Sequence, residues 1–251
     1  MARMLYQFPL SHYSEKARWL LDSKALDYQV RSLIPGPHRW TSLRLAGIRT
    51  LPILRDGPHI IGDSTAIALH LDKHYPQHPL IPDDPAIREQ VLALEALADE
   101  LGVHVRRCVW SLVIHEDQIN RLFFNFGSYG DLVQRLSGLF RPILRQMIRH
   151  RFGVWPKVTE DSWKKIQGMM DLLAAQLEHN SQNYLVGSQF TLADLTMAAM
   201  LAPLIGPSSS VWSDDAVQAS EDSARDIFRN HITGQWVENM YRKHRGPIFP
   251  P

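Results

Sequence analysis

The sequence predicts two parts of different fold class, an α/β half of order βαβαββα followed by an all-helical bundle. Up to residue 75, short apolar or alternating runs typical of strands alternate with longer segments of helical periodicity. Four prolines then break the pattern between residues 76 and 86, and beyond them we find only long amphipathic helical patterns. We therefore predict an N-terminal domain over 1–77, a linker over 78–85 and a helical C-terminal domain over 86–251.

The elements of the α/β half follow from hydrophobic period and from chain breakers. The first apolar run is compact and closed by Pro9, which is typical of a buried strand. The pair Asp56-Gly57 is suited to a tight turn between two strands, and Asp63 or Ser64 is suited to cap the helix that follows. The expected strands are 3–8, 27–33 and two within 51–62, and the expected helices are 14–25, 38–46 and 63–75.

Three long amphipathic patterns predict the helical half, and a proline, Pro142, interrupts the second of them. Thr191 and Asp194 form a capping box, with Asp in place of Glu, at the start of a fourth and more apolar helix. Phe190 occupies the staple position before that helix. The three patterns cover 86–116, 131–152 and 162–180, and the core-facing stripe of the third consists of Trp163, Ile166, Met170, Leu173 and Leu177.

Composition excludes several classes of function. The formal net charge is +1 and no run of one sign of charge occurs, so we expect no nucleic-acid partner. No segment has the length and apolar character of a signal peptide or a membrane-spanning helix. We therefore expect a cytoplasmic protein without a membrane partner.

Neither a metal nor a reactive cysteine is expected. Cys108 is the only cysteine, which excludes an internal disulfide framework, and its apolar helical surroundings predict a buried, inert thiol. His70 and His74 are spaced i, i+4, but no third ligand accompanies them, so we predict no metal site and no permanently bound cofactor. The pair Arg106-Arg107 is predicted to lie on a solvated helix face.

One polar stretch needs an explanation. Residues 10–18, LSHYSEKAR, place two serines, a histidine and a tyrosine at the start of a helix. Such residues can cap the helix, or they can line a site, because a helix N-terminus concentrates unpaired N–H groups and positive potential. For Ser11 and Ser14 these residues alone leave both interpretations open.

Three stretches in order along the chain resemble the glutathione transferase superfamily. The first is SHYSEKAR after QFP, which is similar to the S-x-x-S-x-K-x-R signature of the serine- and cysteine-type classes. The second is TLPIL followed by GDSTAIALHLDKHYP, and the third is YLVGSQFTLADLTMAAML. The resemblance implies a thioredoxin-like N-terminal domain, a helical C-terminal domain and glutathione as co-substrate.

The resemblance also implies roles for individual residues. Ser11 would be the catalytic residue, whose hydroxyl stabilises the glutathione thiolate. Leu51 would pair with the cysteinyl backbone of glutathione, next to a cis bond to Pro52. Ser64 would hold the γ-glutamyl carboxylate, and Asp63 would face the γ-glutamyl amino group.

Other positions are weaker candidates or depart from the family pattern. Tyr13 and Ser14 are alternatives to Ser11 as the hydroxyl donor, and Gln7 occupies the position of the tyrosine that other classes use. The loop over 46–49 reads AGIR where the family often has N-P-x-G, which alters the region that holds the glycyl end of glutathione. The weaker candidates for that end are His38, Arg39 and Trp40.

The resemblance therefore predicts an enzyme that binds glutathione on the first domain and an apolar electrophile between the domains, as a homodimer. A non-catalytic binding or assembly module on the same fold is the first alternative. A glutathione-dependent lyase, isomerase or reductase is the second.

Overall fold

The computed structural model describes residues 3–33, 36–114, 141–179, 183–214 and 225–245. The α/β half contains β1 (Arg3–Gln7), α1 (His12–Ser23), β2 (Tyr28–Ser32), α2 (His38–Ala46), β3 (Ile53–Asp56), β4 (His59–Gly62) and α3 (Ser64–His74). The second half contains α4 (Pro85–Val113), α7 (Arg141–Phe152), α8 (Pro156–His179), α9 (Leu192–Ile205), α11 (Asp226–Asn230) and α12 (Ile232–His244). This order confirms the predicted fold class.

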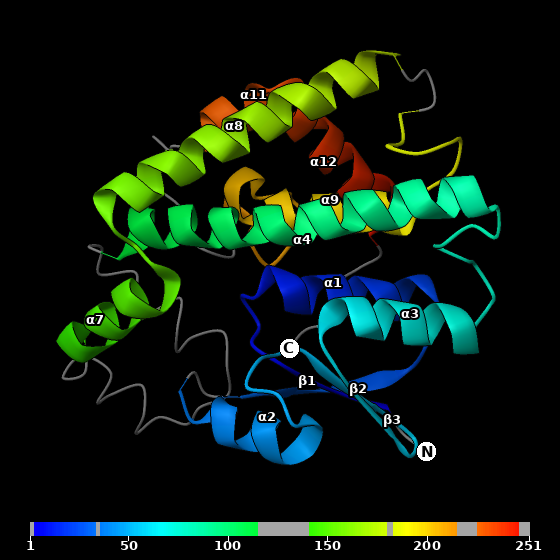
Figure 1. Cartoon of the computed structure of the whole chain (residues 1–251), viewed down its shortest axis with the longest axis horizontal. Coiled ribbons are helices and arrows are strands. Elements are labelled where there is room, and N and C mark those ends of the chain that lie inside the picture. Colours follow the sequence, from blue (N-terminus) through cyan, green and yellow to red (C-terminus); the bar gives the residue numbers. More distant parts are fainter. Residues whose placement is uncertain (1–2, 34–35, 115–140, 180–182, 215–224, 246–251) are drawn as a thin grey trace.

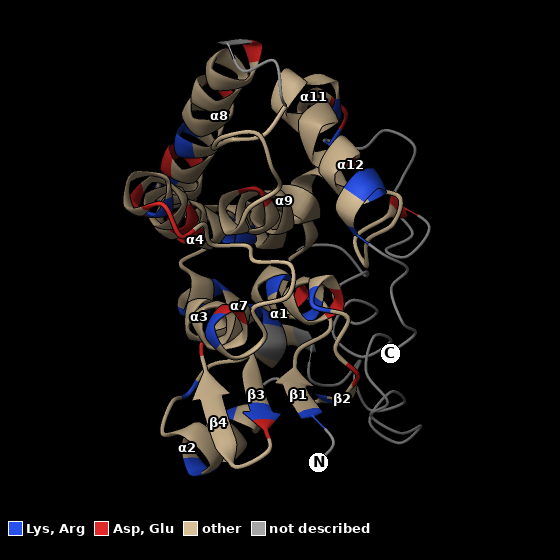
Figure 2. Cartoon of the chain, turned by 90° about the vertical axis from the view of Figure 1, so that its right-hand side faces the viewer, with Lys and Arg blue, Asp and Glu red and all other residues tan. Residues whose placement is uncertain are grey.

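The four strands form one mixed sheet in the order β2-β1-β3-β4. β1 pairs in parallel with β2 and antiparallel with β3, which in turn pairs antiparallel with β4. Leu5 lies opposite Leu54 in this register, and both are fully buried, so the central strands anchor the sheet in the core. α1 and α3 lie between the strands and the helices α4 and α9, whereas α2 lies at the end of the molecule away from the helical half (Figures 1 and 2). This is the thioredoxin-like arrangement.

α1 begins two residues earlier than the sequence pattern predicts. Its first residue is His12, because Ser11 is the N-cap and its hydroxyl oxygen accepts the N–H of Ser14 at 3.4 Å. The helix ends at Ser23, ahead of Ala25 with φ 50°. The polar residues after Ser11 thus belong to the first turn of the helix rather than to the loop before it.

The other predicted features of the α/β half occur close to their expected places. Gly57, with φ 57°, leads the turn between β3 and β4, while Asp56 still belongs to β3. Asp63 is the N-cap of α3, and the Leu51–Pro52 bond is cis as expected.

The long helix α4 and the buried helix α9 form the centre of the second half. Every residue of α9 is buried, and α4 and α1 pack against it. α8 starts at Pro156, six residues before the predicted pattern. The last two residues of the first predicted pattern, 115–116, and the first ten of the second, 131–140, lie outside the described residues. Within the described residues no helix is long and apolar enough to cross a bilayer.

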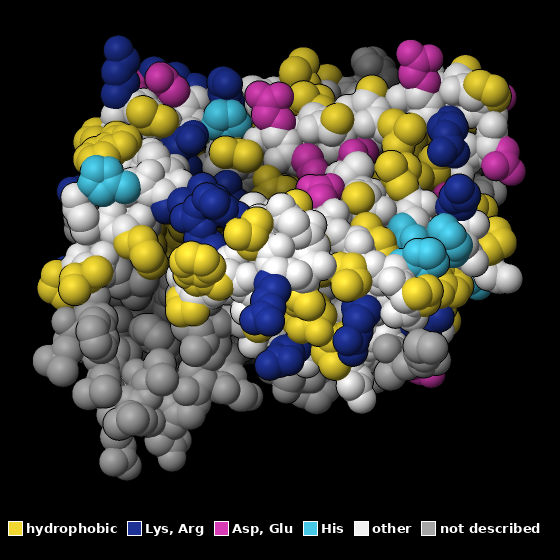
Figure 3. Space-filling model, turned by 60° about the horizontal axis from the view of Figure 1, so that its bottom comes forward, with side chains coloured by type: hydrophobic (Ala, Val, Ile, Leu, Met, Phe, Trp, Pro, Cys, Tyr) yellow, Lys and Arg dark blue, Asp and Glu magenta, His cyan; other side chains and the backbone are white. Residues whose placement is uncertain are grey.

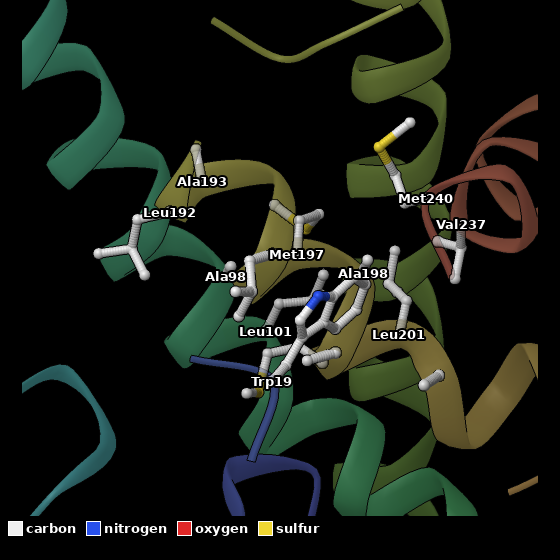
Figure 4. Packing of buried hydrophobic residues seen from close by; sticks show 14 of the residues in the cluster. Trp19, Ala98, Leu101, Leu192, Ala193, Met197, Ala198, Leu201, Val237 and Met240 are labelled. Atoms are coloured by element: carbon white, nitrogen blue, oxygen red, sulfur yellow. The ribbon is translucent and has the colours of Figure 1, made fainter. Parts of the chain in front are cut away.

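Trp19 of α1 joins the two halves through one hydrophobic core. Its side chain is fully buried, and Figure 4 shows it pointing among Leu101 of α4 and Ala198 and Leu201 of α9. The indole N–H donates to the carbonyl of His244 at 3.0 Å. The first helix is therefore fixed against both the centre and the end of the helical half. The division into domains over 1–77 and 86–251, joined by a linker over 78–85, stays a prediction.

Two buried ionic clusters reinforce this junction. Lys16 of α1 is fully buried and pairs with Glu95 and with Asp99 of α4, the latter at 3.0 Å. On the other side of α1, Glu15 is also fully buried and accepts from Arg18 at 2.7 Å and from Arg245 at 2.7 Å. Removing one member of either cluster would weaken the compensation of a buried charge.

The capping box at the start of α9 forms as predicted. The carboxylate of Asp194 is fully buried and accepts the Thr191 N–H at 2.9 Å and the Thr191 hydroxyl at 2.8 Å. It also accepts the N–H of Leu185 at 2.7 Å, a contact that the capping pattern alone does not predict. One carboxylate thus ties the preceding loop to the first turn of the most buried helix.

Replacing Asp194 by alanine is expected to lower the free energy of unfolding by about 2–4 kcal/mol, because three buried donors lose their acceptor. Denaturant unfolding measures the loss. Asp84 is a matched control, since it caps α4 through the N–H groups of Ala86 and Ile87, both at 3.0 Å, but is exposed. Asp84→Ala is expected to cost distinctly less, and equal losses would contradict a special role for Asp194.

Candidate functional site

A pocket of about 380 Å³ lies between the α/β half and the helical half. One wall comes from the loop between β1 and α1 and from the segments before and after α2. The other wall comes from α4, α7 and the end of α9. The lining residues are Phe8, Leu10, Ser11, His12, Leu33, Gly36, His38, Arg39, Arg49, Thr50, Leu51, Arg106, Val109, Trp110, Met147, Ile148, Arg151, Phe152, Pro203 and Trp212.

Ser11 combines the two roles that the sequence left as alternatives. It caps α1 and it also lines the pocket. In the cap its oxygen acts as an acceptor, so its O–H remains available to donate to a group in the pocket. The helix N-terminus behind it adds about 0.3–1 kcal/mol of stabilisation for an anion. A hydroxyl donor at this place suits a developing or bound anion.

Tyr13 and Ser14, the alternatives to Ser11, are not among the residues that line the pocket. The hydroxyl of Tyr13 donates to the carbonyl of Asp99 at 2.8 Å, and burial raises the pKa of this phenol to about 12. Ser14 is fully buried in the first turn, and its hydroxyl has no hydrogen-bond partner within the described residues. The geometry thus favours Ser11 among the three hydroxyls.

The loop before β3 and the start of α3 are held together. Leu51 lines the pocket beside Ser11, and the carbonyl of Pro52 accepts the N–H of Asp63 at 3.2 Å. Asp63 adopts φ 80° and ψ 137°, a conformation that costs a non-glycine residue about 1–3 kcal/mol, and its carboxylate caps α3. Ser64 is buried, yet its hydroxyl has no partner in the part of the chain that the structure describes. Of these four residues only Leu51 is among those that line the pocket, and the bond between Asp63 and Pro52 joins the start of α3 to the residue that follows Leu51.

The three weaker candidates at the start of α2 separate into two groups. His38 and Arg39 line the pocket, whereas Trp40 is 80% exposed and is not among the lining residues. The departing loop over 46–49 ends in Arg49, which also lines the pocket. The loop change therefore places a further cation at the rim of the pocket on the α/β side.

Sequence reasoning missed the basic character of the helical wall. Arg106 and Arg151 line the pocket, so the prediction of a solvated face at Arg106-Arg107 was wrong. Arg107 also points to protein groups, donating to the carbonyl of Phe152 at 3.0 Å and to Ser162. The spacing of Arg106, Val109 and Trp110 is i, i+3, i+4, which could have indicated one shared helix face.

His12 adds a neutral polar group to the pocket. Burial, together with the nearby charge of Arg106, lowers the pKa of His12 to about 3, so its imidazole is uncharged at neutral pH. The permanently charged residues of the lining are then four arginines, Arg39, Arg49, Arg106 and Arg151, and no Asp or Glu is among the described lining residues. The potential in the pocket favours an anion.

The histidine pair and the cysteine singled out in the sequence are not among the residues that line the pocket. His70 and His74 stack on each other at 4.2 Å between ring centroids, with His59 nearby, but the described residues contain no group of three side chains placed to hold a metal ion. Cys108 is fully buried as predicted, and burial raises the pKa of its thiol to about 12. It is therefore a packing residue.

Comparison with known proteins gives consistent matches in both halves of the chain. Two family models match, that of the glutathione S-transferase N-terminal domain over residues 5–79 and that of the C-terminal domain over residues 156–210. A glutathione S-transferase of Triticum aestivum is 36% identical over 81 residues, which span 32% of this chain and only 38% of the wheat protein. Glutathione S-transferase D7 of Drosophila melanogaster is 26% identical over 252 residues, covering 98% of this chain and 92% of the fly protein.

Solved structures of glutathione S-transferases have a similar fold. A glutathione S-transferase of Methylobacterium radiotolerans, solved in complex with glutathione sulfonate, superposes with a TM-score of 0.61 at 18% identity, covering 98% of this chain and 92% of that one. At this identity the likeness establishes the fold alone. The family models, the relatives and the fold together show that the chain belongs to the glutathione transferase superfamily.

Proposed function

We propose that the protein is a glutathione transferase that activates the thiol of glutathione for attack on an electrophile. The observation that carries the proposal is the position of Ser11, at the N-terminus of α1 and on the wall of the pocket between the two halves. A free thiol is only a few per cent ionised at neutral pH, so an enzyme of this type must stabilise the thiolate. The Ser11 hydroxyl and the helix N-terminus are suited to do so.

Glutathione would lie along the edge formed by Leu51, Pro52, Asp63 and Ser64. The backbone of Leu51 would pair with the cysteinyl backbone as an added strand does. The Ser64 hydroxyl at the start of α3 would hold the γ-glutamyl carboxylate, and Asp63 would face the γ-glutamyl amino group. Arg39 and the nearby Arg49 would be the cations near the glycyl carboxylate, and the imidazole of His38 would be a further polar group there.

The reaction would proceed in the pocket next to Ser11. The thiol loses its proton to solvent, and the Ser11 hydroxyl donates a hydrogen bond to the resulting thiolate. The sulfur electron pair then forms a bond to the electrophilic carbon, and the leaving group departs with the electrons of the bond that breaks. The apolar part of the electrophile would contact Phe8, Val109 and Trp110 on the pocket wall.

Conjugation and binding assays distinguish this proposal from its alternatives. Glutathione is expected to raise the melting temperature, and a general aryl halide is expected to be conjugated faster than in buffer. Stabilisation without conjugation of any electrophile would favour a non-catalytic module or a lyase, isomerase or reductase with a narrow substrate. Absence of any stabilisation would exclude every glutathione-dependent function and leave the non-catalytic module. We also propose that the protein forms a homodimer in solution. Sedimentation measurements of its molar mass test this proposal.

Ser64→Ala is expected to weaken glutathione binding about tenfold, since the charged carboxylate loses a hydrogen bond. The free energy of unfolding should stay unchanged, because the Ser64 hydroxyl has no partner among the described residues. Ser42, another buried serine whose hydroxyl has no partner in that part of the chain, is a matched control outside the pocket lining. Isothermal titration should separate the two variants; equal affinities would remove Ser64 from the site.

A further inference from the structure

Within the described residues, the helical wall of the pocket carries two arginines without a counter-charge. Arg106 of α4 and Arg151 of α7 line the pocket, and within the described residues neither forms an ion pair. The Nε atom of Arg106 is buried and has no hydrogen-bond partner there. Among the side chains that line the pocket in the described part of the chain, no carboxylate compensates them. On the face shown in Figure 3, Lys and Arg side chains occur in several places, a group of them in the lower middle, whereas most Asp and Glu side chains lie in the upper half.

Several other arginines that are shielded from solvent pair with carboxylates, whereas Arg151 itself is exposed. Arg18 and Arg245 both bond to Glu15, and Arg225 and Arg229 both bond to Asp214. A half-buried guanidinium that lacks a carboxylate is costly, and burial lowers the pKa of Arg106, although not enough to discharge it at neutral pH. An anionic ligand would relieve this cost.

Glutathione is not the best occupant of these two arginines. Its carboxylates would be held on the opposite wall, by the start of α3 and by the cations Arg39 and Arg49. Arg106 and Arg151 belong to the wall that would face the co-substrate. The anion that pairs with these two arginines would then be a part of the electrophile itself.

The surroundings of Arg106 also indicate the shape of this electrophile. The guanidinium of Arg106 lies over the ring of Phe152 at 4.8 Å, and Phe152 is parallel to Trp110 with 6.0 Å between the ring centroids. These flat apolar surfaces suit a planar group, and the guanidinium fork matches a carboxylate. We propose that the co-substrate of this protein is a planar, aromatic electrophile with a carboxylate that pairs with Arg106 and Arg151, an inference that rests on the proposed transferase function.

A matched pair of aryl halides tests this proposal. The first is a chlorodinitrobenzoate with its carboxylate para to chlorine, and the second is the corresponding neutral carboxamide. In both, the glutathione thiolate forms a bond to the ring carbon, the carbon–chlorine bond breaks, chloride leaves with the electron pair, and the thiol proton goes to solvent. Each enzymatic kcat/KM is divided by the rate constant of the same reaction without enzyme.

The corrected kcat/KM is expected to be roughly tenfold to hundredfold higher for the carboxylate compound than for the carboxamide, because the carboxylate gains a hydrogen-bonded charge pair. Arg106→Met should abolish the preference, and Arg106→Lys should retain part of it because the charge remains. Arg151→Met should reduce it. Arg88→Met, an exposed position on the same helix, should leave it unchanged. Thermal melts show whether each variant is folded.

Two results would overturn the proposal. The first is equal corrected rates for both compounds with the unmodified enzyme. The second is an equal loss for both compounds in Arg106→Met, which would assign Arg106 to the thiolate rather than to the co-substrate.

A binding measurement without glutathione separates this inference from the proposed function. Neither halide reacts without the thiol, so isothermal titration can compare the affinity of the protein for each. Tighter binding of the carboxylate, lost in Arg106→Met, would support the anion site even if no conjugation occurred. Equal affinities in an enzyme that does conjugate would reject the anion site and leave the transferase function standing.

Discussion

Ser11→Ala is expected to lower kcat/KM for conjugation about a hundredfold, the usual cost of removing one hydrogen-bond donor from a reacting anion. The pKa of the bound glutathione thiol should rise by about one to two units, since a hydrogen bond to a charged group is worth about 1.5–3 kcal/mol. The loss of the cap contact at 3.4 Å should cost only a small part of the stability. Steady-state rates at several pH values measure both effects.

Three further variants on α1 show whether the effect belongs to Ser11. Ser23→Ala makes the same chemical change at the far end of the helix, where the hydroxyl donates to the carbonyl of Trp19, and should retain full activity. Ser14→Ala and Tyr13→Phe test the alternative donors. If either of them, and not Ser11→Ala, raised the thiol pKa, the assignment of the thiolate donor would be wrong.

Glu15→Gln is expected to lower the free energy of unfolding by about 3–5 kcal/mol, the typical cost of leaving a buried charge without its partner. Glu15 is fully buried and binds Arg18 and Arg245, and Arg245 also binds Asp22 at 2.5 Å. The variant would leave Arg245, just after α12, with only Asp22 to hold it against α1. Denaturant unfolding measures the loss.

The same cluster predicts a pH dependence. Burial by itself would raise the pKa of Glu15, but the charges of Arg245 and Arg18 outweigh it and lower the pKa from 4.5 to about 2. A carboxylate whose pKa is lower in the folded state binds fewer protons there than in the unfolded state. Its stabilising contribution is therefore complete above pH 4.5 and is lost as the pH falls towards 2.

Glu15→Gln should therefore unfold with a shallower dependence on pH between about 4.5 and about 2 than the unmodified protein. Glu160 is the control, because it pairs with Lys164 on the exposed surface of α8, at 2.6 Å. Glu160→Gln should keep the pH dependence of the unmodified protein. An unchanged acid slope in Glu15→Gln would refute the linkage.

The local features of the fold could be predicted because each depends on neighbouring residues. Pro9 closes a strand, Asp63 caps a helix, and Asp194 lies three residues after Thr191, so each signal is contained within a few positions. Ser11 could be proposed as a site residue because the motif around it is short and continuous. Only its exact relation to α1 had to come from the structure.

The helical wall could not be predicted because it depends on contacts between distant segments. Arg106 and Arg151 are 45 residues apart in the sequence and meet only when α4 and α7 pack together. The pairing of Glu15 with Arg245 spans almost the whole chain. In an isolated sequence, a charged residue on an amphipathic helix is most simply interpreted as solvated. The spacing of Arg106, Val109 and Trp110 indicates a shared helix face, but not that this face lines a pocket.

The ionisation of bound glutathione tests the central claim most directly. The thiolate absorbs in the far ultraviolet, so a pH titration of the complex, with the spectrum of the protein alone subtracted, yields the pKa of the bound thiol. We predict a pKa about one to two units below that of free glutathione, and a return towards the free value in Ser11→Ala. A bound thiol that titrates like the free one in the unmodified protein would contradict the claim that this site activates glutathione.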